Sequence, residues 1–560
     1  MRKQGVRFDI KWLIILLIIA LLLIFLVFPL TYLVVRAFLR NGEFSLEAFR
    51  RIYTYSMNWE ALKNTLITAS LAMLLGVAIA FPMAWLVGRT DLPGKGFFRM
   101  LSVTTYMVPP YVGAMAWMRL LNPKAGTLNS FLQKLFGLSE MPMNIYSIGG
   151  LVWVLATFYY PFAFITISRA MERMDPSLEE ASRISGASPL KTLFTVTLPL
   201  MLPSIVASGL LVFIAAASCY GIPSIIGAPG KIYTVTTRIA EYVSIGSDEG
   251  LSDATALAVV LMLLGILILI LTDFIIGKRD YTTVSGKSVR PNIVELGKWR
   301  IPALIIVSIL SFILQILPFF TVFATSFTKN MGKSIFSQGN FTTKYWGIIF
   351  SRDAILSSAK NSLLAAFLAA TLGMIVAVTM AYLLKRTKQR GRRIPDFLIA
   401  LGSGTPSVVI ALALIMTMNG RFGINIYNTI WIMIVAYMVK YMMMGMRPLV
   451  SGFSQIAPSL EEAAQISGAG WLRRMKDVIL PLLLPTVVAG WFLIFMPSFY
   501  ELTMSTLLYS SKTETLGVQL FDYQTYHSQQ TAAALASGIL LLVIAVNVLL
   551  KKLSRGRFSI

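Results

Sequence analysis

The sequence predicts an all-α, polytopic membrane protein with about 12 transmembrane helices in two parallel repeats of six spans. The first observation is composition: the chain is 56% apolar, only 13% charged, and has a mean hydropathy of +0.73. The second is a series of long apolar runs, and the third is a segment that recurs 282 residues later. A bilayer-spanning helix needs about 20 mostly apolar residues, so 560 residues accommodate a dozen spans with their loops. Such a composition excludes an ordinary soluble globular protein.

Twelve apolar runs follow one another along the chain. Those of the first half lie at 12–35, 66–88, 100–118, 148–168, 200–226 and 254–272. Those of the second half lie at 301–326, 362–384, 397–417, 422–446, 482–508 and 531–550. We therefore predict a first half at 1–277, a cytoplasmic linker at 278–300 and a second half at 301–560. The first run is too long for a signal peptide and lacks a small-residue cleavage site, so we expect a retained anchor.

The distribution of basic residues predicts the orientation. The formal net charge is +24, and 32 of the 49 Lys and Arg lie in segments that face the cytoplasm if the N-terminus does. This bias follows the positive-inside rule and predicts cytoplasmic N- and C-termini. It also accounts for the net charge without a nucleic acid, so no nucleic-acid partner is predicted. The first outer loop runs against the rule, with Arg36, Arg40, Arg50, Arg51 and Lys63.

The internal repeat is the strongest signal in the sequence. Residues 176–203 and 458–485 align without gaps and share 17 of 28 residues, beginning with Pro-Ser-Leu-Glu-Glu-Ala. Weaker similarities pair Asn64-Thr-Leu with Asn361-Ser-Leu, Pro110 with Pro406, and Pro29 with Pro318. An even number of spans gives both halves the same orientation, so an axis along the membrane normal relates them. A translocation path is then expected between the halves.

Each repeated segment is predicted to form two short cytoplasmic helices joined at a glycine. Ser177 with Glu180, and Ser459 with Glu462, have the spacing of a capping box, and Gly186 and Gly468 have the positions of helix ends. Ser188-Pro189 resembles a new cap followed by a first-turn proline. The glutamates could act as caps and nothing more. Capping does not explain why two loops stay alike while the spans diverge, whereas one type of partner bound twice does.

The repeated loops resemble the EAA motif of ABC importer permeases. Glu180-Ala-Ser-x-x-x-Gly186-Ala and Glu462-Ala-Ala-x-x-x-Gly468-Ala are each followed by Leu-Pro twelve residues after the glycine. In that family the loop is a coupling helix that seats in a groove of a separate ATPase, and six-span halves resemble the type I importer permease. Ser182 departs from the usual second alanine but is small enough for the same groove. The resemblance assigns ATPase coupling to Glu179, Glu180, Ala181, Ser182, Gly186, Ala187, Glu461, Glu462, Ala463, Ala464, Gly468 and Ala469.

The same resemblance implies the rest of the complex. Two copies of a cytoplasmic ABC ATPase would bind one copy of this fused chain, and an extracytoplasmic solute-binding protein would deliver the solute. The complex would lie in a bacterial cytoplasmic (inner) membrane, with ATP used by the partner ATPase and no cofactor in this chain. Two shorter motifs, Cys219-Tyr-Gly-Ile-Pro223 and Tyr500-Glu-Leu-Thr503, are similar to fused permeases of the iron(III), thiamine and phosphonate branch. They make iron(III) the leading solute and make Tyr220, Pro223, Tyr500 and Glu501 candidates for the path or gate.

The chain lacks the residues of an enzyme. The two Gly-Lys-Ser triplets, 286–288 and 332–334, have Tyr281 and Phe327 where a P-loop requires its first glycine. One Cys and one His exclude a Cys/His metal site, and neither a catalytic residue nor a metal ligand is predicted. An ion-coupled secondary transporter remains the alternative, and it would use charged residues within the membrane. Lys440 and Glu501 are the candidates, although we expect Lys440 to extend toward the cytoplasm and Glu501 to hydrogen-bond between spans.

Overall fold

The computed structural model describes residues 10–40, 42–175, 177–277, 293–333, 337–387 and 391–553, and these residues are overwhelmingly helical. The first half contains a two-stranded hairpin, β1 (Leu39–Arg40) and β2 (Glu43–Phe44), and helices α1 (Ile10–Leu22), α2 (Phe28–Ala37), α3 (Glu47–Thr54), α4 (Ser56–Arg89), α5 (Lys95–Tyr106), α6 (Pro110–Leu121), α7 (Thr127–Phe136), α8 (Ile148–Arg173), α9 (Ser177–Ile184), α10 (Pro189–Thr192), α11 (Leu198–Ala217), α12 (Val235–Ile245) and α13 (Asp248–Gly277).

The second half follows the same order of helices, with two exceptions. It comprises α14 (Arg300–Ser311), α15 (Leu317–Ser326), α16 (Lys344–Ser351), α17 (Asp353–Arg386), α18 (Ile394–Gly404), α19 (Ser407–Thr417), α20 (Ile430–Gln455), α21 (Pro458–Ile466), α22 (Trp471–Arg474), α23 (Leu480–Phe499), α24 (Thr503–Leu508), α25 (Leu516–Tyr526) and α26 (Gln529–Leu553). It has no counterpart of α7 and has one more short helix, α24, before α25. The predicted all-α polytopic fold is therefore confirmed.

The count of about 12 spans is revised. Among the described residues, ten helices are long and apolar enough to cross a membrane, or up to eleven if one bent pair counts as a span. The third apolar run of each half is broken, between α5 and α6 at Pro109-Pro110 and between α18 and α19 at Thr405-Pro406, where the axis bends by 105°. Proline lacks the N–H that would continue the helix, and its ring displaces the preceding turn. Each piece of 11 or 12 residues is too short to cross alone.

A single wide turn of π-helix precedes four of the described helices, and each of these four has a proline at its second residue. These turns span Leu23–Val27 before α2, Leu193–Thr197 before α11, Phe312–Ile316 before α15 and Met475–Ile479 before α23. A π-turn lengthens the hydrogen-bonding step and so makes room for the proline ring without ending the span. The pairing of Pro29 with Pro318 in the sequence reflects this shared local structure.

The two halves cross over each other at their first spans. Within the halves, α4 packs against α8 and α11, and the equivalent α17 packs against α20 and α23. The first span of each half also lies against the other half: α2 packs on α19 and α1 on α17 and α18, while α15 packs on α6 and α14 on α5. Each half therefore completes part of the packing of the other.

The predicted linker is described only at its end. Residues 278–292 lie outside the described residues, whereas Val294 forms a parallel bridge with Thr90 just after α4. The Leu296 N–H donates to Asp91 Oδ1 (3.0 Å), and Arg300 lies 3.6 Å from the other oxygen of Asp91. The chain entering the second half is therefore fastened to the end of α4.

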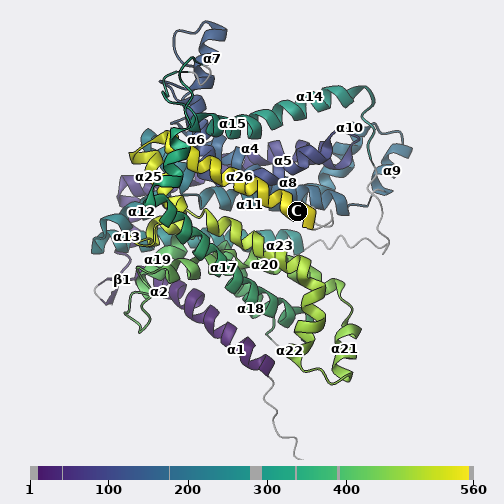
Figure 1. Cartoon of the computed structure of the whole chain (residues 1–560). Coiled ribbons are helices and arrows are strands. Elements are labelled where there is room, and N and C mark those ends of the chain that lie inside the picture. The colour runs from purple at the N-terminus through teal and green to yellow at the C-terminus, as the bar shows by residue number, and fades with distance from the viewer. Residues whose placement is uncertain are drawn as a thin grey trace, which may run out of the picture.

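The repeated loops lie apart from each other at the same end of the bundle, and the first loop between spans lies at the opposite end (Figure 1). Helices α9, α10, α21 and α22 occupy the first end. At the opposite end, two of the basic residues that run against the positive-inside rule have acidic partners. Arg40 pairs with Glu47 and Glu249, and Arg51 lies 2.7 Å from Asp253.

Candidate functional site

The predicted helix ends at Gly186 and Gly468 have the expected geometry. Their φ angles are +84° and +81°, the left-handed region that glycine adopts without a steric penalty. The Ala187 N–H donates to the Ser182 carbonyl (3.1 Å), and the Ala469 N–H donates to the Ala464 carbonyl (3.0 Å). This six-to-one hydrogen bond satisfies a carbonyl at the end of each short helix. Both loops therefore turn in the same way.

The predicted capping boxes are wrong. Residue 176 lies outside the described residues, and Ser177 is the first residue of α9 instead of its cap. The Ser177 N–H donates to Asp175 Oδ1 (2.9 Å), which lowers the pKa of Asp175. In the second half, Pro458 begins α21, so Ser459 falls inside the first turn. Proline is favoured at the first helical position and shifts the start of the helix by one residue. The predicted cap at Ser188 is confirmed, because its Oγ accepts from the Lys191 N–H (3.3 Å).

The first glutamate of each Glu-Glu pair points into the protein. Glu179 is 2% exposed, forms an ion pair with the equally buried Arg89 at the end of α4, and accepts from Thr197 Oγ1 (2.7 Å). We call Glu179 and Glu461 the anchor glutamates, because each ties its short helix to the end of a 34-residue helix.

Glu461 has an equivalent position but a different set of partners. It accepts from the Tyr382 hydroxyl (2.7 Å) and lies 3.8 Å from Arg386 and 3.7 Å from Arg474. Tyr382 and Arg386 belong to the last turns of α17, as Arg89 belongs to the end of α4. Both short helices are therefore fastened to the end of a long helix of their own half.

The opposite side of each loop is an exposed apolar surface. Ile184 is 87% exposed and Ile466 is 89% exposed, at the same position of the repeat. Four flanking leucines are exposed beside these two isoleucines. We call the six residues together the coupling surface: Leu178, Ile184, Leu190, Leu460, Ile466 and Leu472. Exposed apolar groups of this kind mark interaction sites. Sequence reasoning missed them, although Leu and Ile are identical at all three positions of the repeat.

The remaining predicted coupling residues flank this surface. Glu180 and Glu462 are exposed, as are Ala181, Ala463, Gly186 and Gly468, whereas Ser182, Ala464, Ala187 and Ala469 are partly buried. Ser182, the departure from the family pattern, has its Oγ 3.1 Å from Thr192 Oγ1. This contact joins α9 to α10 and gives the serine a role within the loop.

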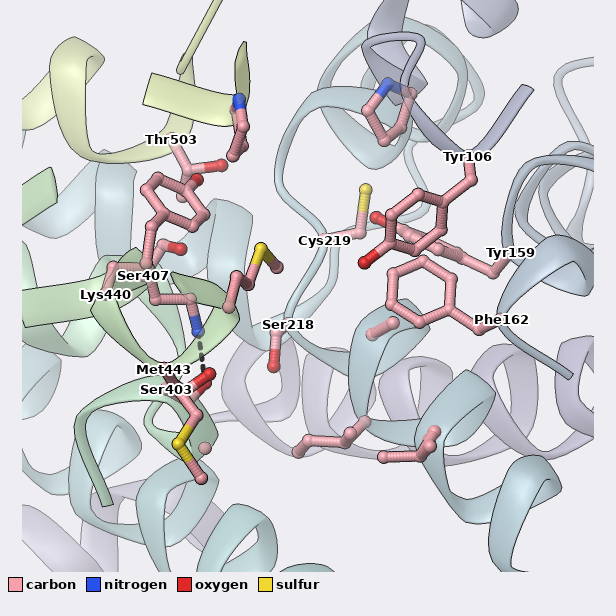
Figure 2. Close-up of a pocket in the computed structure, with 18 of the residues that line it drawn as sticks. Tyr106, Tyr159, Phe162, Ser218, Cys219, Ser403, Ser407, Lys440, Met443 and Thr503 are labelled. Atoms are coloured by element: carbon pink, nitrogen blue, oxygen red, sulfur yellow. Dashed lines mark hydrogen bonds between the residues drawn. The ribbon is translucent and has the colours of Figure 1, made fainter. Parts of the chain in front are cut away.

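A cavity of about 470 Å³ lies between the halves. Figure 2 shows aromatic side chains of the first half, including Tyr106, Tyr159 and Phe162, facing Lys440 and Met443 of the second half. Of the four candidates for the path or gate, Tyr220, Tyr500 and Glu501 line this cavity. Pro223 is buried at the start of a π-turn, Pro223–Gly227, and does not belong to the lining. The Tyr111 hydroxyl donates to the Tyr500 carbonyl (3.1 Å) and joins the halves there.

Two charged side chains of the cavity are engaged by backbone groups. Glu501 accepts from the N–H groups of Met504 and Ser505 (2.9 Å each to Oε2), so it caps α24 instead of hydrogen-bonding between spans as predicted. Lys440 donates to the carbonyls of Ser403 (2.8 Å) and Thr405 (2.7 Å), at the break between α18 and α19. The prediction that Lys440 extends toward the cytoplasm is wrong, because the broken helix provides carbonyls that need a donor inside the membrane.

Two stretches of the chain match one protein family. Residues 81–279 and 369–558 each match the family described as binding-protein-dependent transport system inner membrane component. The two matches fall in the first and second halves.

Individual relatives span the whole chain or one half of it. A ferric transport system permease protein of Actinobacillus pleuropneumoniae is 25% identical over 554 residues, which cover 98% of this chain and 78% of that protein. A Salmonella typhimurium protein, provisionally named a 2-aminoethylphosphonate transport system permease protein, is 28% identical over 261 residues. The aligned residues cover 46% of this chain and 90% of that protein. The solved structure of a bacterial alginate ABC transporter, in complex with a periplasmic protein bound to alginate pentasaccharide, aligns with 50% of this chain at a TM-score of 0.40 and 19% identity.

Proposed function

Since the chain belongs to the family of binding-protein-dependent transport system inner membrane components, we propose that it is the fused permease subunit of an ATP-driven importer of iron(III). The two halves would form the whole membrane path, so one copy of the chain would serve each complex. Two copies of an ABC ATPase would dock at the coupling surface from the cytoplasm, and a solute-binding protein would approach from the opposite side. ATP would be hydrolysed on the ATPase.

The observation that carries the proposal is the equivalence of the two loops. Each presents an almost fully exposed isoleucine at a helix end, and each is tied by an anchor glutamate to a helix that runs the length of the bundle. Helix capping by the glutamates, which the structure does not show, would in any case not account for the exposed isoleucines. Two copies of one ATPase would need two such surfaces at the same end.

Energy would pass from the ATPase to the cavity through rigid elements. Movement of α9 or α21 would displace Arg89 or Arg386 at the end of α4 or α17, and α17 packs against α20 and α23. Helix α20 carries Lys440, and Tyr500 and Glu501 directly follow α23. Tyr220, Tyr500 and Glu501 are our candidates for lining the path, and Pro223 for holding the turn behind Tyr220.

The identity of the solute is the most specific part of the proposal. Support comes from the ferric permease relative that matches nearly the whole chain, together with the Tyr220 and Tyr500 motifs. Lys440 and Glu501 are engaged by backbone, while Asp273 and Arg447 also line the cavity. Among the described residues no group of His, Cys, Asp or Glu could hold a metal ion, so the cavity offers a passing solute aromatic rings, hydroxyls and separate charges, not a metal cage. Selectivity would then rest largely on the binding protein. A thiamine or phosphonate importer is the alternative within the same class, and an ion-coupled secondary transporter is the alternative outside it.

Replacement of the exposed isoleucines tests the docking. We expect Ile184→Asp with Ile466→Asp to abolish copurification of the ATPase, because a charge would have to be buried in an apolar groove. The matched control is Ile184→Leu with Ile466→Leu, which keeps the apolar contact and should retain the ATPase. If the control chain copurifies no ATPase and uptake follows an ion gradient, the secondary transporter replaces the proposal.

Substitution of the loop glycines tests the coupling itself. Each Cβ would meet open space, so the positive φ is the obstacle to a side chain. Gly186→Pro or Gly468→Pro should uncouple ATP hydrolysis from uptake, because proline fixes φ near −65°. Gly468→Asn, which tolerates the left-handed conformation, should retain most of the activity. Equal uptake by the Pro and Asn variants would contradict a coupling role for this turn.

Uptake of labelled solutes tests the substrate. Cells with and without the chain should differ in uptake of iron(III) and should not differ for thiamine or aminoethylphosphonate. Iron uptake that is independent of the chain would exclude iron and leave the permease assignment intact.

A further inference from the structure

Helix α7 stands apart from the helical bundle. It lies within residues 122–147, which join α6 to α8, and Figure 1 shows it projecting sideways near the ends of α6 and α15 that lie away from the coupling surface. The corresponding segment of the second half, 418–429, is a short turn closed by a bridge between Asn419 and Asn425. Helix α7 is therefore an addition to the first half.

Specific contacts hold α7 in place. Asn129 is fully buried, its Nδ2 donates to the Met143 carbonyl (2.6 Å), and its Oδ1 accepts from the Met143 N–H (3.1 Å). Gly137, with φ +62°, ends the helix, and the Gly137 N–H donates to the Gln133 carbonyl. The segment is thus a preformed helix fixed to the loop that follows it.

Large apolar side chains of α7 are exposed on one side. Phe131 is 59% exposed, Leu135 60% and Phe136 67%. Leu128 and Leu132 lie between them on the same side and are partly buried, whereas Thr127, Ser130, Gln133 and Lys134 occupy the other side. An ordered helix that presents three large apolar side chains needs an apolar partner to cover them.

The position of α7 identifies that partner as lipid. Helix α6 packs against α15, a part of a membrane-spanning segment whose Phe320 and Phe323 are exposed, as expected for side chains that contact lipid. Helix α7 follows α6 and projects sideways from the bundle near the same end of α15 (Figure 1). A solute-binding protein would instead approach the end of the bundle.

We propose that α7 is an interfacial helix that lies in the outer leaflet of the bilayer, with Phe131, Leu135 and Phe136 inserted at the boundary between headgroups and acyl chains. An amphipathic helix with one apolar side and a lysine on the polar side has this preference. Lys124 and Lys134 are placed to contact anionic headgroups. The helix would brace the first half against the membrane, whichever solute the protein carries.

Nitroxide labels on single cysteines test this position. The full chain is reconstituted into vesicles of phosphatidylethanolamine and phosphatidylglycerol, with labels at Leu135→Cys, Phe136→Cys and, as the control on the polar side, Thr127→Cys. The native Cys219 is buried and remains. The measurement is the ratio of collisions with oxygen to collisions with a water-soluble nickel chelate at each label. We expect this ratio to be several-fold higher at residues 135 and 136 than at residue 127.

Equal access of the nickel chelate to all three labels in these vesicles would overturn the proposal. If the labels at 135 and 136 are open to the chelate in vesicles and become protected only when the solute-binding protein is added, α7 is a protein-docking helix and the lipid assignment is wrong. All three sites are exposed, so cysteine substitution there removes no buried contact, and neither result depends on transport activity.

Discussion

Glu179 and Glu461 occupy equivalent positions 282 residues apart but have different electrostatic surroundings. The side chains of Glu179 and Arg89 are 3% and 1% exposed, and Val294 of the linker hydrogen-bonds to the Arg89 carbonyl. The Glu461 side chain is 13% exposed, and its partners Arg386 and Arg474 lie at 3.8 and 3.7 Å. Removing one partner of a fully buried pair leaves an uncompensated charge, whereas a more exposed pair can recruit water.

We therefore expect Glu179→Ala to destabilise the protein more than Glu461→Ala. The first change should cost about 3–5 kcal/mol, as for one partner of a buried ion pair. The second should cost about 2 kcal/mol, as for a hydrogen bond to a charged group. Thermal unfolding of the purified chain in detergent measures both, and Glu180→Ala, at an exposed position of the same helix, is the control. Equal losses for the two anchor glutamates would show that burial does not distinguish them.

Individual residues differ in how far the sequence predicts them. Gly186 and Gly468 are predictable because a helix end that needs positive φ selects glycine from local geometry alone. Ile184 and Ile466 could have been found, because they are large apolar residues at equivalent positions of a repeated polar loop. Lys440 could not, because its acceptors, Ser403 and Thr405, lie about 35 residues away on a helix whose break is a tertiary feature.

At the scale of elements, the repeated Asn-Thr-Leu and Asn-Ser-Leu motifs start an outer helix in each half. Asn64 Nδ2 donates to the Tyr233 carbonyl (3.1 Å), and Thr65 Oγ1 accepts from the Val235 N–H (2.9 Å), the first of α12. Asn361 and Ser362 make the same contacts with the start of α25, where Leu516 donates to Ser362 Oγ (2.8 Å). The motif thus supplies acceptors for N–H groups that a helix start leaves unpaired.

We expect Thr65→Val and Ser362→Ala each to destabilise the protein by about 1–3 kcal/mol, because each leaves a buried N–H without its acceptor. The apparent unfolding temperature in detergent measures the loss. Ser357→Ala, at an exposed position of α17, provides the control and should leave that temperature unchanged. An equally small effect of all three substitutions would mean that water reaches the starts of α12 and α25.

Long continuous elements are predictable and interrupted ones are not. Helices α4 and α17 follow from apolar runs of sufficient length, although each extends well beyond its run toward the N-terminus. The breaks at Pro109-Pro110 and Pro406 fall inside runs that hydropathy alone reads as one span. Pro82, Pro161 and Pro448 lie within continuous helices, so a proline by itself does not locate a break. The difference lies in tertiary contacts, such as that of Lys440, which satisfy the freed carbonyls at a break.

For the whole molecule, contacts between the halves are part of the core. The Tyr111 hydroxyl donates to the Tyr500 carbonyl across the cavity, and Gln315 of the second half hydrogen-bonds to the buried Tyr160 of the first. The first span of each half adds further contacts between the halves, since α2 packs on α19 and α15 packs on α6. The repeat in the sequence predicts two halves, but the sequence does not predict which helices pack against the other half. Apolar residues of a spanning helix can face either lipid or another helix, so the sequence of one helix does not identify the helix that it packs against.

This crossing of the first spans predicts that the two halves assemble without a covalent connection. A chain ending at residue 285 and a second chain starting at residue 286, expressed together, should copurify in equal amounts and keep the uptake activity of the intact chain, because the contact of Leu296 with Asp91 remains within the complex. Removing residues 1–37 from the first chain should abolish copurification, since α19, α17 and α18 would lose the helices that cover them. The measurement is recovery of the untagged half with the tagged one, after extraction in mild detergent. Recovery of two separately stable halves would mean that the crossing spans contribute little to assembly and that the linker holds the molecule together.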